Sequence, residues 1–113
     1  MNKLSQLRAA LHQSNFSFAQ MLDFIDRHYC YTPSAFSNNG VINAANTNQG
    51  SGKILALALL EGFSKEEALL AYGEHYRHVL TTPEHTDHAN IRALLKGQLA
   101  LVVFEQVALA KRV

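Results

Sequence analysis

The six histidines are the residues of this sequence best suited to chemistry, because an imidazole can transfer a proton or bind a metal near neutral pH. His75 and His78 are three residues apart, and so are His85 and His88. Metal sites use pairs at this spacing, completed by a further histidine or a carboxylate such as Asp87. The sequence contains no HExxH motif and no cysteine-containing signature, and such pairs also occur on solvated helix faces. We therefore predict no metal and no cofactor, and we interpret His75 and His78 as surface residues.

A long uncharged segment is the second feature that could form a site. Residues 31–52 contain no charged side chain, but they include five asparagines and three glycines. A loop of this length inside a small protein is usually functional or locally folded. Asparagine and glycine tolerate left-handed backbone angles, and Asn39-Gly40 is a strong turn signal. We predict a compact loop held by its own hydrogen bonds, in which a short strand could form at 41–42.

Polar side chains in and around this loop are the candidate binding residues. Hydroxyl, amide and guanidinium groups beside an uncharged loop suit a small polar or anionic ligand. The candidates are His28, Tyr31, Asn43, Asn46, Lys53, Tyr76, Arg77, His88, Asn90 and Arg92. The alternative is a buried polar network that only holds the loop in shape.

The segment Gly50-Ser51-Gly52-Lys53 is similar to part of a nucleotide-binding P-loop. A P-loop also requires a glycine five residues before the Gly-Lys pair and a serine or threonine after the lysine, where this sequence has Thr47 and Ile54. We therefore assign no P-loop. A glycine-rich helix N-terminus beside a lysine can still bind a carboxylate or phosphate through backbone N–H groups. The alternative is that Ser51 simply caps a helix.

Cys30 could act as a nucleophile with His28 or His88 as its base. A lone cysteine beside aromatic residues is more often an unreactive small apolar side chain, so we leave the catalytic residue unassigned. A single cysteine also excludes an internal disulfide and fits a reducing compartment.

Helical patterns account for most of the remaining chain. Apolar spacing and capping residues predict helices over 4–12, 17–29, 51–61, 64–80 and 87–110. Ser17 with Gln20 and Ser64 with Glu67 form capping boxes, and Gly62 is placed to end the third helix. No series of strands is evident. We predict a single all-α domain over residues 1–113, a bundle of about five helices with the long loop between the second and third.

The bulk properties exclude several classes of partner. A net charge of +1 with scattered basic residues provides no surface for nucleic acid. The N-terminus lacks the apolar segment of a signal peptide, and no apolar stretch approaches the ~20 residues of a transmembrane helix, so we predict a soluble protein. The last predicted helix is almost entirely apolar beyond Gly97, so it could cross the core or form a homodimer.

Several short motifs stand in order along residues 18–98. They are Phe24-Ile25, His28-Tyr29, Tyr31-Thr32-Pro33, Phe36, Asn39-Gly40, Asn43, Asn46, Asn48, Gly50-Ser51-Gly52-Lys53, Ser64, Glu66-Glu67, Tyr72-Gly73, Tyr76-Arg77-His78-Val79-Leu80, Pro83 and Thr86-Asp87-His88-Ala89-Asn90-Ile91-Arg92. This combination resembles the HopJ type III effector family. The resemblance implies a bacterial cytoplasmic protein that type III secretion could translocate, with a host or bacterial protein as partner. It implies no established activity, but it directs attention to the 31–53 loop and the 87–92 segment.

Two functions fit this pattern. The first is a binding or interaction domain in which the 31–53 loop and the 87–92 segment form a polar pocket. The second is a small hydrolase or transferase that uses His88 or His28 as a general base, with loop N–H groups stabilising an oxyanion. An enzyme requires one of these histidines within hydrogen-bond reach of a nucleophile or bound water inside a cleft. The sequence leaves open whether the protein is an enzyme.

Overall fold

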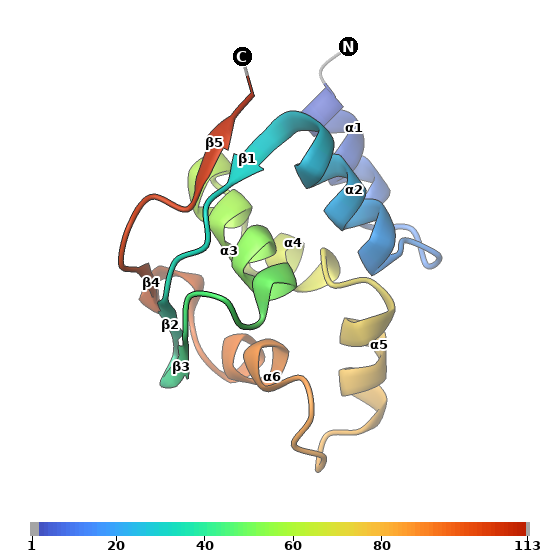
Figure 1. The fold of residues 1–113 in the computed structure, drawn as a ribbon. Helices are drawn as coiled ribbons and strands as arrows, with labels where there is room; N and C mark the ends of the chain where they lie inside the picture. Colours follow the sequence, from blue (N-terminus) through green and yellow to red (C-terminus); the bar gives the residue numbers. More distant parts are fainter. Residues whose placement is uncertain (1–2, 113) are drawn as a thin grey trace.

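The computed structural model describes residues 3–112, which combine helices with two small antiparallel sheets (Figure 1). The helices are α1 (Lys3–Ala10), α2 (Phe18–His28), α3 (Gln49–Glu61), α4 (Lys65–Leu70), α5 (Glu74–Thr81), α6 (Ala89–Lys96) and the short 3-10 helix η1 (Leu99–Leu101). The strands are β1 (Tyr29–Tyr31), β2 (Phe36–Asn38), β3 (Val41–Asn43), β4 (Val102–Phe104) and β5 (Leu109–Lys111). The prediction of an all-α bundle of about five helices is therefore wrong, and the fold is mixed α/β.

Helix α3 forms the centre of the molecule. Ile54, Leu55 and Leu57 are fully buried, as an apolar sequence on all sides of a helix predicts. In the view of Figure 1, α1 and α2 lie to the right of α3 and the strands lie to its left. Helices α5 and α6 lie in the lower part of the molecule. The core also takes side chains from every α-helix and from β1, β2, β4 and β5.

Local signals gave two helix starts and one helix end correctly. The Ser17 hydroxyl accepts from the Gln20 N–H at 3.1 Å, and the Gln20 side chain accepts from the Ser17 N–H at 2.9 Å. Ser64 and Glu67 make the same capping box at the start of α4. Gly62 ends α3 in the left-handed conformation, with φ 70°. These contacts lie within a few residues, so the sequence alone contains them.

The helix predicted over 64–80 is wrong, because the chain forms two helices there. α4 ends at Leu70 and α5 begins at Glu74, with Gly73 between them at φ 59°. A Cβ at Gly73 would lie 2.5 Å from the backbone nitrogen of Phe18, so only glycine allows the chain to approach α2 this closely. Apolar residues continue at helical spacing across the break, so the sequence pattern concealed it.

The helix predicted over 87–110 is wrong beyond Lys96. The apolar run that follows forms η1, β4 and β5, and these strands pair with β2 and β1 far back in the chain. Three-residue strands with such distant partners leave little periodic signal in a sequence. The helix on which a homodimer was predicted is thus absent, and dimerisation stays a prediction. No helix within residues 3–112 has the length and apolar character needed to cross a membrane.

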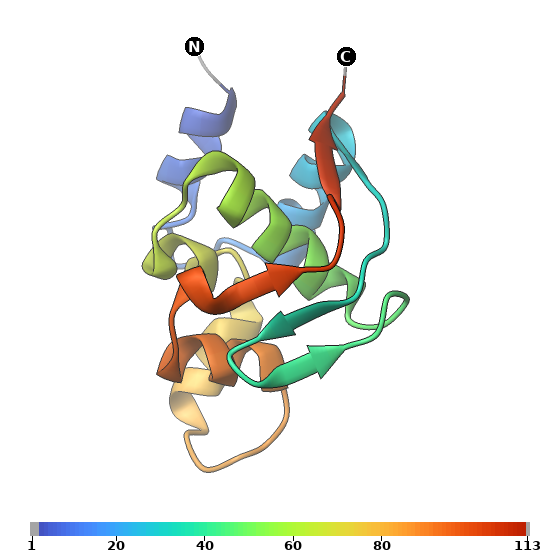
Figure 2. The same cartoon turned by 90° about the vertical axis from the view of Figure 1, so that its left-hand side faces the viewer.

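The 31–53 loop is locally folded. β2 and β3 form a hairpin around Asn39-Gly40, where both residues have positive φ, as the Asn-Gly signal indicates. β3 contains the short strand anticipated at 41–42. β4 pairs along the other edge of β2, so the sheet order is β3-β2-β4 (Figure 2). After β3, only five residues connect the hairpin to the first residue of α3, so the last part of the 31–53 loop is the N-terminus of α3.

Candidate functional site

A cavity lies where the 31–53 loop meets the start of α6. Its volume is about 330 Å³, which suits a small molecule. The lining comes from the start of α2, the start of α3, the α4–α5 turn with α5, and the start of α6. The lining residues are Phe18, Asn48, Gly50, Ser51, Tyr72, His75, His88, Ala89, Asn90 and Ile91.

Two helix N-termini face this cavity. Gly50 and Ser51 belong to the first turn of α3, and residues 89–91 are the first turn of α6. The first N–H groups of a helix have no carbonyl partner within that helix. Within residues 3–112, neither N-cap residue, Asn48 or His88, makes a side-chain capping hydrogen bond. Both helix ends therefore offer backbone N–H groups to a ligand, and both dipoles favour a negative charge there.

Both N-cap residues adopt the left-handed backbone conformation. The φ angle is 50° at Asn48 and 53° at His88. This region is uncommon for residues other than glycine, although asparagine and histidine enter it more often than most. The helix predicted from residue 87 therefore begins at Ala89, and the alternative in which Ser51 caps α3 is wrong because Asn48 is its N-cap. Unusual backbone angles at two caps around one cavity are typical of functional sites.

The Tyr72 hydroxyl is a polar group without a partner beside this cavity. The residue is 2% exposed, and its hydroxyl makes no hydrogen bond within the described part of the chain. Burial raises the pKa of Tyr72 well above its usual value, while the nearby Ser51 side chain lowers that pKa without completing a hydrogen bond of normal geometry. An unpaired buried hydroxyl costs about 1–3 kcal/mol. A ligand that accepts from Tyr72 would recover part of this free energy.

Two imidazole rings also line the cavity. The ring centroids of His75 and His88 are 5.0 Å apart. His75 packs edge-on against Phe18, with their centroids 4.8 Å apart. A neutral imidazole both donates and accepts a hydrogen bond, and a protonated one carries a positive charge. This part of the lining is therefore compatible with an anionic group.

A buried network of asparagines joins the start of α6 to the β2–β3 hairpin and to Asn48, the N-cap of α3. The Asn90 side chain accepts from Asn38 and Asn43 at 3.1 Å each and donates to Asn43 at 2.9 Å. Asn43 also accepts from Asn48 at 2.7 Å. Asn38, Asn43 and Asn90 are all buried, so these amides are already paired and fix the hairpin to the start of α6. The buried-network interpretation thus describes Asn43 and the side chain of Asn90.

Three charged or titratable candidates lie away from the cavity. The Lys53 ammonium pairs with Asp26 of α2 at 2.8 Å. Arg77 donates to the Phe16 carbonyl at 2.9 Å. His28 packs against an aromatic ring of its own helix at the far end of α2. These side chains therefore support the fold around α2 and do not line the cavity.

Four further candidates, Tyr31, Asn46, Tyr76 and Arg92, are also absent from the cavity lining. Tyr31 packs over Gly52, where a Cβ would collide with the Tyr31 hydroxyl, so this glycine serves packing. Arg92 binds the loop before α6. Asn46 is exposed, and Tyr76 is half-buried against the core. Of the ten candidates, two line the cavity and one supports it, namely His88, Asn90 and Asn43.

Phe18 and His75 line the cavity but were not among the candidates. Phe18 is the first residue of α2, after the N-cap Ser17, and nothing in the sequence distinguishes it from an ordinary core phenylalanine. Its ring covers Gly50, where a Cβ would lie 2.6 Å from the ring. His75 was interpreted as a surface residue because pairs at its spacing from His78 also occur on solvated helix faces, but α5 begins anew after the break at Gly73 and His75 lines the cavity. A glycine inside a helical pattern is the one sequence signal that could have revealed this turn.

Known proteins match nearly the whole chain. The family model described as HopJ type III effector protein matches residues 4–109. The chain belongs to the HopJ family. The resemblance noted in the sequence motifs is thereby confirmed. The crystal structure of a protein of unknown function, VPA0580, is 36% identical, with a TM-score of 0.90, and the alignment covers 99% of this chain and 95% of that one. No curated protein matches the chain significantly.

The HopJ match includes every residue that lines the cavity, because all of them lie within residues 4–109. The similar crystal structure belongs to a protein whose function is itself unknown, so it supports the fold and brings no reaction. The cavity therefore provides the main structural evidence about the function of this HopJ chain.

Proposed function

We propose that this HopJ-family protein binds a small anion, a phosphate or carboxylate group, in the cavity between α3 and α6. The observation that carries the proposal is the convergence of two uncapped helix N-termini beside the unpaired Tyr72 hydroxyl. Hydrogen bonds from N–H groups to a charged oxygen are about twice as strong as those to a neutral acceptor. A ligand with several such oxygens could accept from both helices and from Tyr72.

The carboxylates next to the lining residues are already paired. Glu74 accepts from the Phe18 N–H at 2.8 Å, and this hydrogen bond holds the pKa of Glu74 below its usual value. Asp87 accepts from Arg92 at 2.7 Å. The Arg92 cation offsets the negative charge of Asp87, whereas the neutral N–H of Phe18 leaves the charge of Glu74 in place, so an anion must bind on the side of the cavity nearer the two helix N-termini.

The test is a titration of ¹⁵N-labelled protein with inorganic phosphate, and separately with acetate, followed by NMR. The amide signals of Gly50, Ser51 and residues 89–91 should shift together and fit one dissociation constant. The amide of Gly62, at the other end of α3, should not move. If no amide at either helix start responds to millimolar phosphate or acetate, the proposal is wrong.

Two variants separate this cavity from general attraction of anions. His88→Asn keeps a residue that tolerates the left-handed conformation and removes the imidazole from the lining. It should weaken binding while leaving the fold intact. Lys53→Ala removes a cation that pairs with Asp26 outside the cavity, so it should leave binding unchanged. Equal losses in both variants would indicate nonspecific attraction and would contradict the proposal.

The hydrolase or transferase alternative lacks its required contact. Within residues 3–112 no hydrogen bond joins the ring of His88 or His28 to a hydroxyl or thiol. Cys30 is exposed on β1, where its sulfur accepts from Arg112 at 3.2 Å. Ser51 and His88 both line the cavity, so this pair is the place to test for catalysis. Turnover of activated esters that disappears in His88→Asn would favour the enzyme instead.

The family name is the basis for a proposal about cellular role. HopJ proteins are described as type III effectors. We propose that the protein is made in a bacterial cytoplasm and translocated by a type III apparatus toward a host or bacterial protein partner. A reporter fusion whose delivery depends on an intact secretion apparatus tests this step, and delivery without the apparatus contradicts it.

A further inference from the structure

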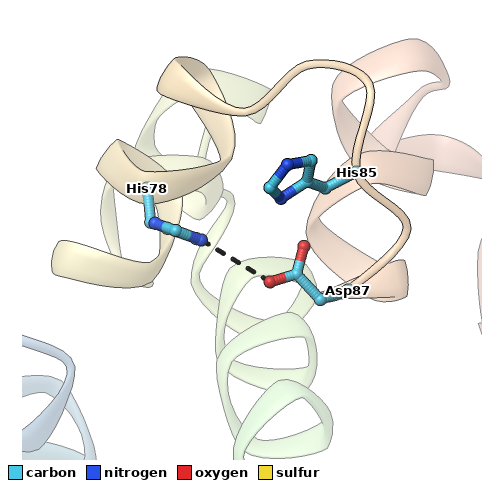
Figure 3. Close-up of side chains that lie close together, drawn as sticks. All are labelled: His78, His85 and Asp87. Atoms are coloured by element: carbon cyan, nitrogen blue, oxygen red, sulfur yellow. Dashed lines mark ion pairs between the residues drawn. The ribbon is translucent and has the colours of Figure 1, made fainter.

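Outside the cavity, three side chains able to bind a metal converge between α5 and the loop before α6 (Figure 3). One ligand atom from each of His78, His85 and Asp87 lies within 4.8 Å of the other two. His78 Nε2 is 3.6 Å from Asp87 Oδ2. We propose that these residues bind a divalent transition metal of the Zn²⁺ type, which the sequence alone did not lead us to expect.

The ligand set and its spacing fit such an ion. Two imidazoles and one carboxylate occur in zinc sites that keep a fourth position open. Bonds of about 2.0–2.1 Å in tetrahedral geometry place ligand atoms about 3.3 Å apart, close to the His78–Asp87 distance. All three side chains are exposed, so changes of rotamer can bring His85 nearer. Magnesium and calcium prefer all-oxygen ligands and fit less well.

Arg92 fixes the loop that carries two of the ligands. Its guanidinium donates to Asp87 Oδ1 at 2.7 Å and to the Thr82 carbonyl at 2.7 Å. The Thr82 hydroxyl donates in turn to the His78 carbonyl at 2.8 Å. One largely buried group therefore ties both ends of the loop to α6 and to α5. Such outer contacts hold ligands in position before the metal arrives.

The same contact prepares Asp87 as a ligand. The Arg92 guanidinium contacts only one of the two carboxylate oxygens of Asp87 in this pair, at 2.7 Å. Because Arg92 occupies Oδ1, Oδ2 remains toward His78. The free carboxylate oxygen and the two imidazoles offer a divalent ion one anionic oxygen ligand and two neutral nitrogen ligands, although Arg92 offsets part of the carboxylate charge.

This site adjoins the cavity but does not depend on it. His88 Nε2 lies 3.8 Å from Asp87 Oδ2, and the His88 ring lines the cavity. His78, His85 and Asp87 are not among the lining residues. Metal binding can therefore be measured without any anion, and its failure would leave the proposed anion site untouched.

The experiment is calorimetric titration of metal-free protein with zinc chloride in a buffer that contains no phosphate. We expect saturable one-to-one binding, and a dissociation constant at least about 10-fold weaker in His85→Ala and in His78→Ala. His12→Ala removes an exposed histidine elsewhere and should bind as the unmodified protein does. Cobalt(II) should give the intense visible absorption of a tetrahedral site, and this absorption should disappear in His85→Ala.

Three results would contradict the metal site or its assigned ligands, provided that each variant is folded. The three substituted histidines are exposed, so circular dichroism should show that each variant folds. Absence of saturable zinc binding in the unmodified protein refutes the site. Unchanged affinity in both His78→Ala and His85→Ala refutes the assigned ligands, and so does loss of binding in His12→Ala alone.

Discussion

Replacement of Tyr72 by phenylalanine is the most informative test of the cavity, because it should change stability and binding in opposite directions. The substitution removes one oxygen and leaves the ring in place. That ring is buried and stacked on Phe18, with centroids 6.4 Å apart. No hydrogen bond to the hydroxyl is lost within residues 3–112. A change in stability therefore reports on the buried hydroxyl itself.

The magnitude follows from the unpaired state of this group. Burial of an unsatisfied hydroxyl costs about 1–3 kcal/mol, and the nearby Ser51 side chain reduces this cost. We expect Tyr72→Phe to raise the free energy of unfolding by about 1 kcal/mol, or Tm by about 4 °C. Loss of a hydrogen bond to a charged ligand costs about 1.5–3 kcal/mol, so phosphate should bind about 10- to 150-fold more weakly.

Urea unfolding without phosphate measures the first effect, and the NMR titration measures the second. Phosphate should stabilise the unmodified protein more than the variant, because a ligand stabilises a fold according to its affinity. If Tyr72→Phe lowers stability and leaves phosphate affinity unchanged, the hydroxyl has a structural partner. Its assignment to the ligand site would then be refuted.

Three further substitutions test how the fold supports the site. Asn90→Ala leaves buried amides of the asparagine network unpaired and should cost about 3 kcal/mol in urea unfolding; a loss below about 1 kcal/mol would contradict the network. Gly73→Ala adds a backbone clash to an unfavourable positive φ, so it should destabilise more than Gly40→Ala, which shares the positive φ but has open space; equal losses of Tm would exclude the clash. Hydrogen bonds from Arg8 hold the pKa of Glu67 below its usual value, so this pair stabilises the fold at neutral pH and the effect is lost as pH falls through the lowered pKa. Glu67→Gln keeps the cap and should reduce stability at pH 6 more than at pH 3, and an equal reduction at both pH values would contradict the linkage.

Features that depend on residues close together in the chain were predicted from the sequence. Both capping boxes, the end of α3 at Gly62 and the Asn39-Gly40 turn were predicted correctly. Each depends on residues no more than a few positions apart, whose types alone determine the geometry. The buried character of α3 was also evident, because its apolar residues cover all sides of the helix.

Apart from β3, the strands were not predicted, nor was the break at Gly73, and both omissions have the same physical reason. β4 and β5 are stabilised by β2 and β1, which lie far away in the chain, and their own three residues specify no partner. The Gly73 turn is determined by the backbone of α2 passing beside it. Both features arise from contacts that form only when the chain folds.

The candidate site divides in the same way. The sequence indicated that the asparagine-rich loop and the 87–92 segment were the places to examine, through residue types and the family resemblance. It could not distinguish His88, which lines the cavity, from Lys53, which pairs with Asp26. Nor could it show that Tyr72 loses its hydrogen-bond partners on burial. Residue types and local spacing determined the helix caps and turns, whereas the direction of each side chain and the meeting of α3 with α6 depended on long-range packing.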